Sequence, residues 1–355
     1  MHDWQANASA TIVGSMPHRD RRKVIDFIIR EIPEIPVWPQ LAGFREEQMM
    51  VQYLEGLPGL EEHDDLVVVN TGSERFEKEL YSFYEECLSV EEGASDLLSS
   101  RFAMGSGTGE TFSEFLDVLR KSRQPWRAVK GQIVGPFTLL SGMKDQNQRA
   151  IIYDDRLQDV VVRHLAMKAR WQIVQLRELG APVIIFLDEP ALAGFGSSAF
   201  ISISAELIGR LLTEIIDAIH QAGALAGIHV CANTDWSLAF DSTVDIINLD
   251  AYNYFDKFAI YNKELYRFIE RGGSVAWGMT PTGDERSIQS ETAETLAERC
   301  MGCIAALATP EVPREKILAH SLFTPTCGCG TLSEANAERV VQVTGQLGRI
   351  MKAHL

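Results

Sequence analysis

The sequence has few cysteines, no long hydrophobic run and no excess of positive charge. Six cysteines among 355 residues are too few for the disulfide framework of a small secreted domain. No apolar stretch approaches the roughly 20 residues that a membrane-spanning helix needs. The formal net charge is −16, from 33 Lys and Arg against 49 Asp and Glu. We therefore expect neither nucleic acid nor a membrane as a partner.

The polar N-terminus also lacks the basic and then apolar pattern of a secretory signal. This absence favours a cytoplasmic location. In such a reducing compartment the cysteines are expected to be buried thiols, metal ligands or nucleophiles.

Short apolar runs alternate along the chain with segments of helical periodicity. The predicted strands are residues 11–13, 36–38, 128–134, 183–187, 224–228, 245–249, 274–277 and 317–321. The main predicted helices are residues 22–32, 157–179, 205–222, 290–306 and 334–351. Strands joined by helical crossovers predict an α/β fold with a parallel sheet, and eight strands are the number that closes a (β/α)8 TIM barrel.

The stretch between the second and third predicted strands is too long for one crossover. Residues 39–127 are therefore interpreted as a helical insertion after strand 2, with helices over 74–87 and 111–121. The whole chain, 1–355, is then a single barrel domain. The glycine-rich stretch 105–109 lacks the lysine of a phosphate-binding P-loop and is interpreted as a flexible loop.

Ionisable and thiol residues gather where the predicted strands end, whereas the strand bodies are mostly apolar. Active sites of (β/α)8 barrels lie at the C-terminal ends of the strands, so this asymmetry indicates an active site. The residues concerned are Ser15, Asp188, Glu189, His229, Cys231, Asp250 and Cys327.

His229 and Cys231 are two residues apart on extended chain, so both side chains leave the same face of the strand. Imidazole nitrogen and thiolate sulfur are preferred zinc ligands. Cys327 could supply a third ligand, although Cys329 is an alternative, and Asp250 or water could supply a fourth. Each residue also has a packing interpretation: His229 as a core histidine, Cys231 as a small buried residue and Asp250 as a turn cap.

Six segments, in order along the chain, carry a family resemblance. They are IVGSMP at 12–17, VGPFT at 134–138, FLDEPA at 186–191, HVC at 229–231, INLD at 247–250 and PTCG at 325–328. Together they resemble the catalytic domain of cobalamin-independent methionine synthase, in the barrel superfamily of uroporphyrinogen decarboxylase and the corrinoid-linked methyltransferases.

The resemblance implies a (β/α)8 barrel, a zinc ion and homocysteine as the methyl acceptor. The implied zinc ligands, with the family's acidic ligand replaced by an aspartate, are His229, Cys231, Asp250 and Cys327. It also implies that Ser15 and Asp188 hold the amino-acid part of the acceptor, with Glu189 beside them and Gln52 where the family has an acidic residue. His229, Cys231, Cys327 and Asp188 are then the catalytic set.

The implied chemistry is methyl transfer to a thiol. A thiol is mostly protonated at neutral pH, and zinc would hold it as the nucleophilic thiolate. Transfer to homocysteine would give methionine. The chain begins at the catalytic barrel of the family, and the tryptophan expected after the VGPFT segment is missing from residues 139–143. Both departures favour a methylated corrinoid or its carrier protein over methyl-folate as the donor.

Two other classes remain open. A uroporphyrinogen-decarboxylase-like enzyme would bind a tetrapyrrole without metal and would need a basic pocket, which the acidic chain disfavours. A non-catalytic protein with structural zinc or a docked corrinoid partner would have a closed site with four protein ligands.

Overall fold

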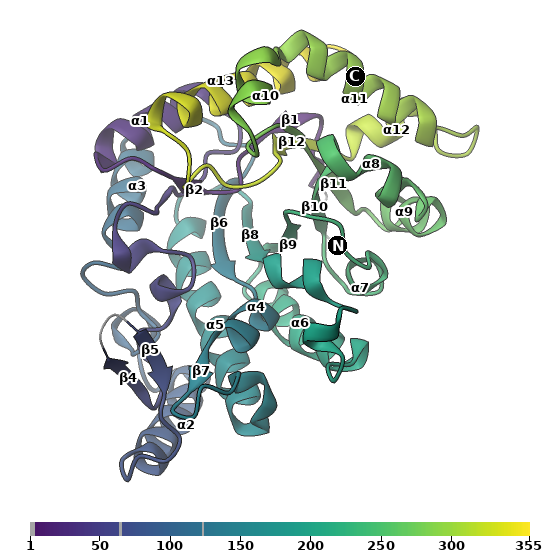
Figure 1. Cartoon of the computed structure of the whole chain (residues 1–355). Coiled ribbons are helices and arrows are strands. Elements are labelled where there is room, and N and C mark those ends of the chain that lie inside the picture. Colours follow the sequence, from purple (N-terminus) through teal and green to yellow (C-terminus); the bar gives the residue numbers. More distant parts are fainter. Residues whose placement is uncertain (1–3, 64–65, 123) are drawn as a thin grey trace.

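The computed structural model describes residues 4–63, 66–122 and 124–355. Its centre is a curled sheet of seven parallel strands (Figure 1). In spatial order the strands are β1 (Ser9–Ala10), β12 (Ser321–Pro325), β11 (Ser274–Thr280), β10 (Ile246–Asp250), β9 (Leu225–Val230), β8 (Val183–Asp188) and β6 (Val129–Val134). Five of the eight predicted strands, from 128–134 to 274–277, correspond to β6, β8, β9, β10 and β11.

Helices surround this sheet on its outer side (Figure 1). The longer ones are α1 (Arg21–Glu31), α5 (Asp155–Arg177), α6 (Ala205–Gln221), α11 (Ala293–Leu307) and α13 (Glu334–Lys352). Each of the five corresponds to a predicted helix, although the one predicted over 290–306 is interrupted between α10 (Glu285–Ser290) and α11. Thr292 caps α11 reciprocally with Thr295, which fixes the start of the helix after the break.

The two edges of the sheet are β1 and β6, and the segment around residues 36–41 lies between them. Val37 forms a single parallel bridge with Lys130 of β6, and β3 (Gln40–Leu41) pairs with β2 (Ser15–Met16) in a separate two-stranded sheet. Pro36 and Pro39 lie in this segment and have no N–H to donate, which limits its pairing with β6 to the one bridge at Val37. The fold is thus an α/β half-barrel in its main sheet, and the predicted full eight-stranded barrel is not confirmed.

Two further strand predictions need correction. Residues 11–13 lie between β1 and β2 and form no strand, and Gly14 beside them has a φ of +144° that breaks the extended run. The prediction over 317–321 is wrong, because residues up to Ala319 belong to helix α12 (Arg314–Ala319) and β12 begins at Ser321. The apolar pair of Ile317 and Leu318 is buried by this short helix; periodicity alone cannot tell such a run from a strand.

The region predicted as an insertion contains a hairpin and two helices. β4 (Leu60–His63) pairs antiparallel with β5 (Leu66–Val69), which pairs in turn with β7 (Lys144–Asp145). Helix α2 (Phe76–Glu91) and helix α3 (Glu110–Lys121) match the helices predicted over 74–87 and 111–121. Gly109, the last residue of the glycine-rich stretch, is the N-cap of α3. The treatment of 39–127 as an insertion in a single domain stays a prediction.

Four helices in the connections after the strands were not predicted. They are α4 (Pro136–Gly142) after β6, α7 (Ser237–Phe240) after β9, and α8 (Ala251–Ala259) with α9 (Asn262–Glu270) after β10. Apolar residues on the inner side of the strands form a small cluster of their own, which includes Ile184, Phe186, Leu225 and Leu322. No helix among the described residues combines the length and the apolar character needed to cross a membrane.

Candidate metal centre

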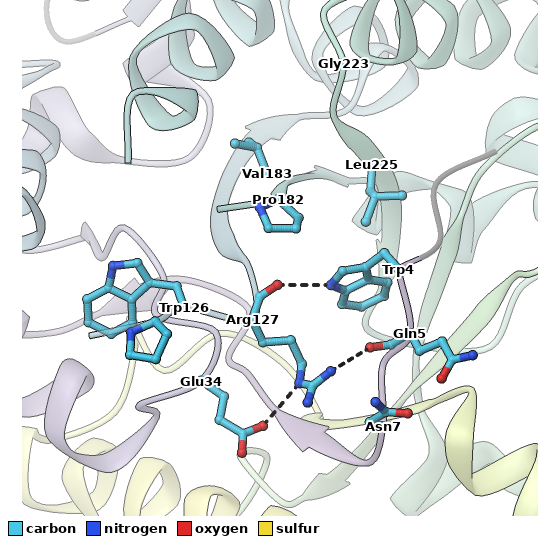
Figure 2. Close-up of a pocket in the computed structure, with 11 residues that line it drawn as sticks. Trp4, Gln5, Asn7, Glu34, Trp126, Arg127, Pro182, Val183, Gly223 and Leu225 are labelled. Carbon is cyan, nitrogen blue, oxygen red and sulfur yellow. Dashed lines mark hydrogen bonds and ion pairs between the residues drawn. The ribbon is translucent and has the colours of Figure 1, made fainter. Parts of the chain in front are cut away.

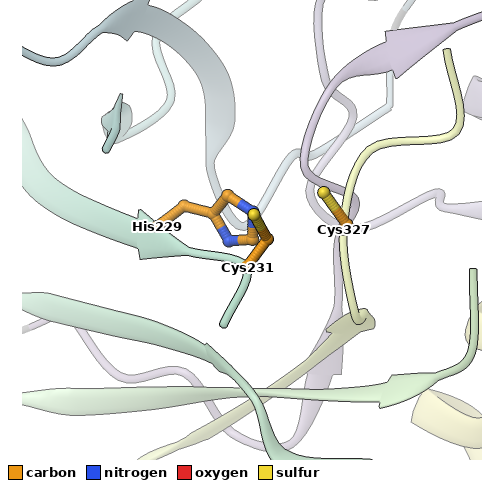
Figure 3. Close-up of side chains that lie close together, drawn as sticks. All are labelled: His229, Cys231 and Cys327. Atoms are coloured by element: carbon orange, nitrogen blue, oxygen red, sulfur yellow. The ribbon is translucent and has the colours of Figure 1, made fainter. Parts of the chain in front are cut away.

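Three side chains predicted as metal ligands converge at the C-terminal end of the sheet. His229 and Cys231 stand at the end of β9, and Cys327 follows β12. One ligand atom from each, a ring nitrogen or a sulfur, lies within 4.8 Å of the other two. In Figure 3 the sulfur of Cys327 points toward His229 and Cys231 from a separate segment of chain. The structure thus brings together three of the four side chains predicted as ligands, and their role in metal binding stays a prediction.

Asn248 fixes the orientation and the tautomer of His229. It is paired with His229 across β9 and β10, and its Oδ1 lies 2.6 Å from the Nδ1 atom of the ring. The Asn248 amide cannot be reversed, because its Nδ2 donates to the carbonyl oxygen of Ala276 at 2.7 Å and to Thr324 Oγ1 at 2.8 Å. Oδ1 must therefore accept, so Nδ1 carries the proton and Nε2 keeps its lone pair.

The free nitrogen of His229 is suited to binding a metal. Burial lowers the pKa of His229 to about 4, with Lys130 lowering it further and the Asn248 hydrogen bond opposing the shift. The ring is therefore neutral at neutral pH. Nε2 is buried and has no hydrogen-bond partner within the described part of the chain. A neutral imidazole with one nitrogen fixed by an amide oxygen is the usual arrangement of a metal-binding histidine.

The two cysteines interact with each other. The Cys327 thiol donates a hydrogen bond to the Cys231 sulfur, which lowers the pKa of Cys231 to about 7 and raises that of Cys327. Burial raises the pKa of both groups and opposes the shift at Cys231. Two sulfurs beside an imidazole lone pair form a donor set that zinc prefers. The residues present therefore fit a zinc ion.

Asp250, the proposed fourth ligand, caps a helix. Its carboxylate accepts from the backbone N–H of Asn253 at 2.9 Å and from Asn253 Nδ2 at 2.8 Å, at the start of α8. It does not belong to the group of converging ligand atoms. Its charge is still close enough to raise the pKa of Cys231. Asp250 therefore acts as the cap that was considered for it, and its role as a metal ligand stays a prediction.

Asp188 ends β8 and stands beside His229 in the register of the sheet. Its carboxylate is buried, and its Oδ1 has no hydrogen-bond partner among residues 4–63, 66–122 and 124–355. Burial raises the pKa of Asp188 to about 7, and the buried ammonium of Lys130 opposes this shift. Lys130 donates to the carbonyl oxygen of Val13 at 2.6 Å and lies 4.3 Å from the centre of the Phe186 ring. The buried cation of Lys130 thus lies near Asp188, the carboxylate predicted to bind the substrate.

Glu189 faces helix α4. Its carboxylate accepts from the backbone N–H groups of Phe137 and Thr138 at 2.9 and 2.8 Å, and from Thr138 Oγ1 at 2.6 Å. Burial raises the pKa of Glu189 to about 7, against the effect of these hydrogen bonds. The observed contacts are those of a residue that anchors α4 to β8, and its predicted contact with substrate stays a prediction.

The remaining predicted residues lie on the facing segments. Ser15 accepts through Oγ from the backbone N–H of Gly330 at 3.3 Å, so it touches the loop that carries Cys327. Gln52 is buried, donating to the carbonyl oxygen of Thr108 at 2.8 Å and accepting from Gln40 Nε2 at 2.6 Å. Cys329 packs into an apolar cluster, and burial raises its pKa to about 12. Cys327, rather than Cys329, therefore supplies the sulfur of the group.

The opposite, N-terminal end of the strands holds a cavity of about 680 Å³ (Figure 2). Trp4, Trp126 and Arg127 line it, together with Val183 and Leu225 at the starts of β8 and β9. None of its lining residues belongs to the group of His229, Cys231 and Cys327. We place the candidate site at the C-terminal end, because the metal-binding side chains converge there.

Sequence reasoning missed three buried polar residues near this site: Asn248, Lys130 and Gln132. A signal for each was available. Asn248 interrupts the apolar run of β10, and Lys130 and Gln132 interrupt that of β6 two residues apart. A polar side chain inside an otherwise apolar parallel strand must find a partner in the interior, so such interruptions indicate a functional or structural network.

Comparison with known proteins gives a likeness of fold. No family model matches the sequence, and no curated protein matches it. Among solved structures, a methyltransferase from Methanosarcina mazei aligns with a TM-score of 0.53 and 11% identity, over 98% of this chain and 94% of its own. A protein from Listeria monocytogenes, to which the activity of a vitamin-B12-independent methionine synthase has been attributed, aligns with a TM-score of 0.48 and 14% identity, over 96% of each chain. The chain therefore shares the α/β fold of the Methanosarcina methyltransferase over nearly its whole length.

Proposed function

We propose that this chain is a zinc-dependent methyltransferase that acts on a thiol acceptor, with homocysteine as the acceptor and methionine as the product. The observation that carries the proposal is the convergence of one imidazole nitrogen and two sulfurs at the C-terminal end of a parallel sheet. The Methanosarcina protein of similar fold is a methyltransferase, which is consistent with this activity. In this proposal the segment around 36–41 completes an eight-stranded (β/α)8 barrel.

His229, Cys231 and Cys327 would hold the zinc, and Asp250 or water would complete the set. Bound zinc would keep the acceptor sulfur deprotonated and nucleophilic at neutral pH. The protein's own residues prepare the site for this role. Asn248 keeps the proton of His229 on Nδ1. The pKa of Cys231 is already lowered to about 7, so its thiol would lose its proton readily when zinc binds.

The amino-acid part of the acceptor would bind beside the metal ligands. Asp188 would accept hydrogen bonds from the amine through Oδ1, and Ser15 would border the same space from the facing segment, with Glu189 and Gln52 as supporting residues. We propose a methylated corrinoid or its carrier protein as the methyl donor, with methyl-folate as the alternative, because residues 139–143 end a short helix and offer no tryptophan for stacking.

The first test is metal analysis of the purified protein followed by titration with homocysteine. We expect about one zinc per chain, and X-ray absorption should detect one additional sulfur neighbour when homocysteine is added. Asp188→Asn should weaken homocysteine binding about tenfold, the loss expected for one hydrogen bond to a charged group, and should leave the zinc content unchanged. Zinc without any response to thiols would instead support a non-catalytic protein.

The second test identifies the donor. Zinc-loaded protein and homocysteine are supplied with methyl-folate in one assay and a methylated corrinoid in another, and methionine is measured. We expect faster methionine formation from the corrinoid. Efficient transfer from methyl-folate alone would contradict the proposed donor and leave the proposed acceptor chemistry intact.

A further inference from the structure

Gln132 is a buried polar residue on the inner side of the sheet. The side-chain position of its neighbour Gly131 faces Gln172 of helix α5, on the outer side. Successive side chains of a strand point to opposite faces, so Gln132 points inward. It is 1% exposed. A fully buried amide in the interior of a sheet needs partners for both its donor and its acceptor atoms.

The donor side of the Gln132 amide is satisfied and its acceptor side is not. Nε2 donates to the carbonyl oxygen of Trp38 at 3.1 Å, which fixes the orientation of the amide. Oε1 is buried without a hydrogen-bond partner among the residues that the structure describes. It lies beside Gly14, where an added Cβ would come within 2.8 Å of it. Gly14 directly precedes Ser15, so Oε1 borders the segment predicted to hold substrate.

A second unpartnered acceptor lies on the neighbouring strand. Val134 pairs with Asp188 and Gln132 pairs with Phe186, so Gln132 and Asp188 are two residues apart along adjacent strands. Phe186 faces the interior, where its ring contacts Lys130, and Asp188, two residues later, shares that face. Oδ1 of Asp188 also lacks a partner within the described ranges. Two buried acceptor oxygens, one from a carboxylate and one from an amide, therefore face the same interior.

We propose that Gln132 Oε1 and Asp188 Oδ1 together accept hydrogen bonds from the ammonium group of an amino-acid thiol. This inference rests on the proposed function and makes Gln132 a residue that determines acceptor specificity. An ammonium group has three N–H donors, so one carboxylate oxygen does not satisfy it. The amide supplies a second acceptor without a second buried negative charge, whose desolvation would be costly.

The nearby cation explains why a neutral acceptor is needed. Lys130 already compensates part of the charge of Asp188, so attraction between Asp188 and an incoming ammonium is reduced. Selectivity must then come from directed hydrogen bonds as well as from charge. A site built to hydrogen-bond a substrate N–H rejects an analogue that lacks it, because the acceptors are left buried and unpaired. The acceptor class is accordingly a thiol that carries an α-amino group.

The experiment compares two thiols that differ only in that group. Homocysteine and 4-mercaptobutanoate, which lacks the amine, are titrated calorimetrically into the zinc-loaded full chain. The wild type should prefer homocysteine. Gln132→Met, of similar size, should weaken homocysteine binding about tenfold, the value of one hydrogen bond to a charged group, and leave 4-mercaptobutanoate unchanged. The matched control is Gln172→Met, which changes a buried glutamine of helix α5 on the outer side of β6 and should preserve the preference.

A second variant covers a failure of Gln132→Met to fold. Gln132→Asn keeps a neutral amide but withdraws its oxygen by one methylene, so it should also weaken homocysteine binding and leave 4-mercaptobutanoate unchanged. Equal weakening of both thiols by Gln132→Met or Gln132→Asn, or no weakening of either thiol, would overturn the role of Gln132. A wild-type protein that holds zinc and binds neither thiol would overturn the proposed function itself, and equal wild-type affinity for both thiols would overturn only this inference.

Discussion

The two ends of the sheet use their polar groups differently. At the N-terminal end, Trp4 Nε1 donates to the carbonyl oxygen of Arg127 at 3.2 Å, and Arg127 pairs with Glu34 at 3.6 Å and donates to the carbonyl oxygen of Gln5 at 3.3 Å. At the C-terminal end, His229 Nε2, Asp188 Oδ1 and Gln132 Oε1 are buried without partners among the described residues. The 680 Å³ cavity therefore lies beside side chains that pair with one another through hydrogen bonds and an ion pair, whereas the candidate metal centre lies beside three unpartnered acceptor atoms.

An unsatisfied buried acceptor costs about 1–3 kcal/mol. Among the described residues such atoms also occur away from this site, as at Gln172 Oε1, so the C-terminal end is distinguished by their combination with converging metal-binding side chains. Four predictions test this contrast, from the largest expected effect to the smallest.

Removal of both sulfurs should have the largest effect. In a Cys231→Ser, Cys327→Ser variant we expect zinc to fall from about one per chain to almost none, because only the imidazole remains of the converging ligands. The measurement is elemental analysis after dialysis against a weak chelator. Cys303→Ser, in helix α11, is the matched control and should keep its zinc. Full zinc retention by the double variant would place the metal elsewhere.

Asn248→Leu should weaken zinc binding by about 10- to 100-fold, the usual cost of removing the residue that orients a ligating histidine. The affinity is measured by competition with a chromogenic chelator. Thr324→Val is the control, because it removes only one of the two acceptors of the Asn248 amide and leaves Ala276 to hold it. Equal losses in both variants would mean that the effect is general loosening of the interior.

Glu189→Gln should lower the free energy of unfolding by about 1–3 kcal/mol, because an amide cannot accept all the donors that the carboxylate accepts from the start of α4. The pKa of Glu189 is raised from 4.5 to about 7, so the folded state binds the extra proton. The stability contributed by this protonation is present below pH 4.5 and is lost as the pH rises through 7. Urea unfolding at pH 5 and pH 8 checks both statements; a stability difference between wild type and variant that does not shrink from pH 5 to pH 8 would contradict the assigned pKa.

Arg127→Ala, at the N-terminal end, should have the smallest effect. The ion pair with Glu34 is partly exposed, with side-chain exposures of 29% and 38%, and such pairs contribute about 0–1 kcal/mol. Zinc content and homocysteine binding should match the wild type. A tenfold change in zinc content or in homocysteine affinity would show that the two ends of the sheet are coupled.

Much of this architecture was readable from the sequence. Strands β6, β8, β9, β10 and β11 consist of buried, mostly apolar residues, which is the pattern of a parallel sheet covered by helices. His229 and Cys231 could be paired because side chains two apart on a strand share a face. Cys327 could be added because the ends of parallel strands meet at one edge. These inferences need only local periodicity and strand direction.

The tertiary structure decided what periodicity cannot reach. Residues 11–13 and 36–38 do not form regular strands, because Gly14 and the prolines at 36 and 39 limit the pairing there. Ile317 and Leu318 are buried as part of helix α12, and strand β12 begins only at Ser321. The tertiary structure also determines the hydrogen-bond partners of individual polar groups. Asp250 bonds to Asn253, Glu189 to the start of helix α4, and Asn248 to His229. The order of residues along the chain specifies which side chains share a face of a strand. Hydrogen bonds, however, require donor and acceptor to lie about 3 Å apart, and chain order does not specify distances between elements. Only the packed fold therefore determines which polar atoms are paired and which are left free for a ligand.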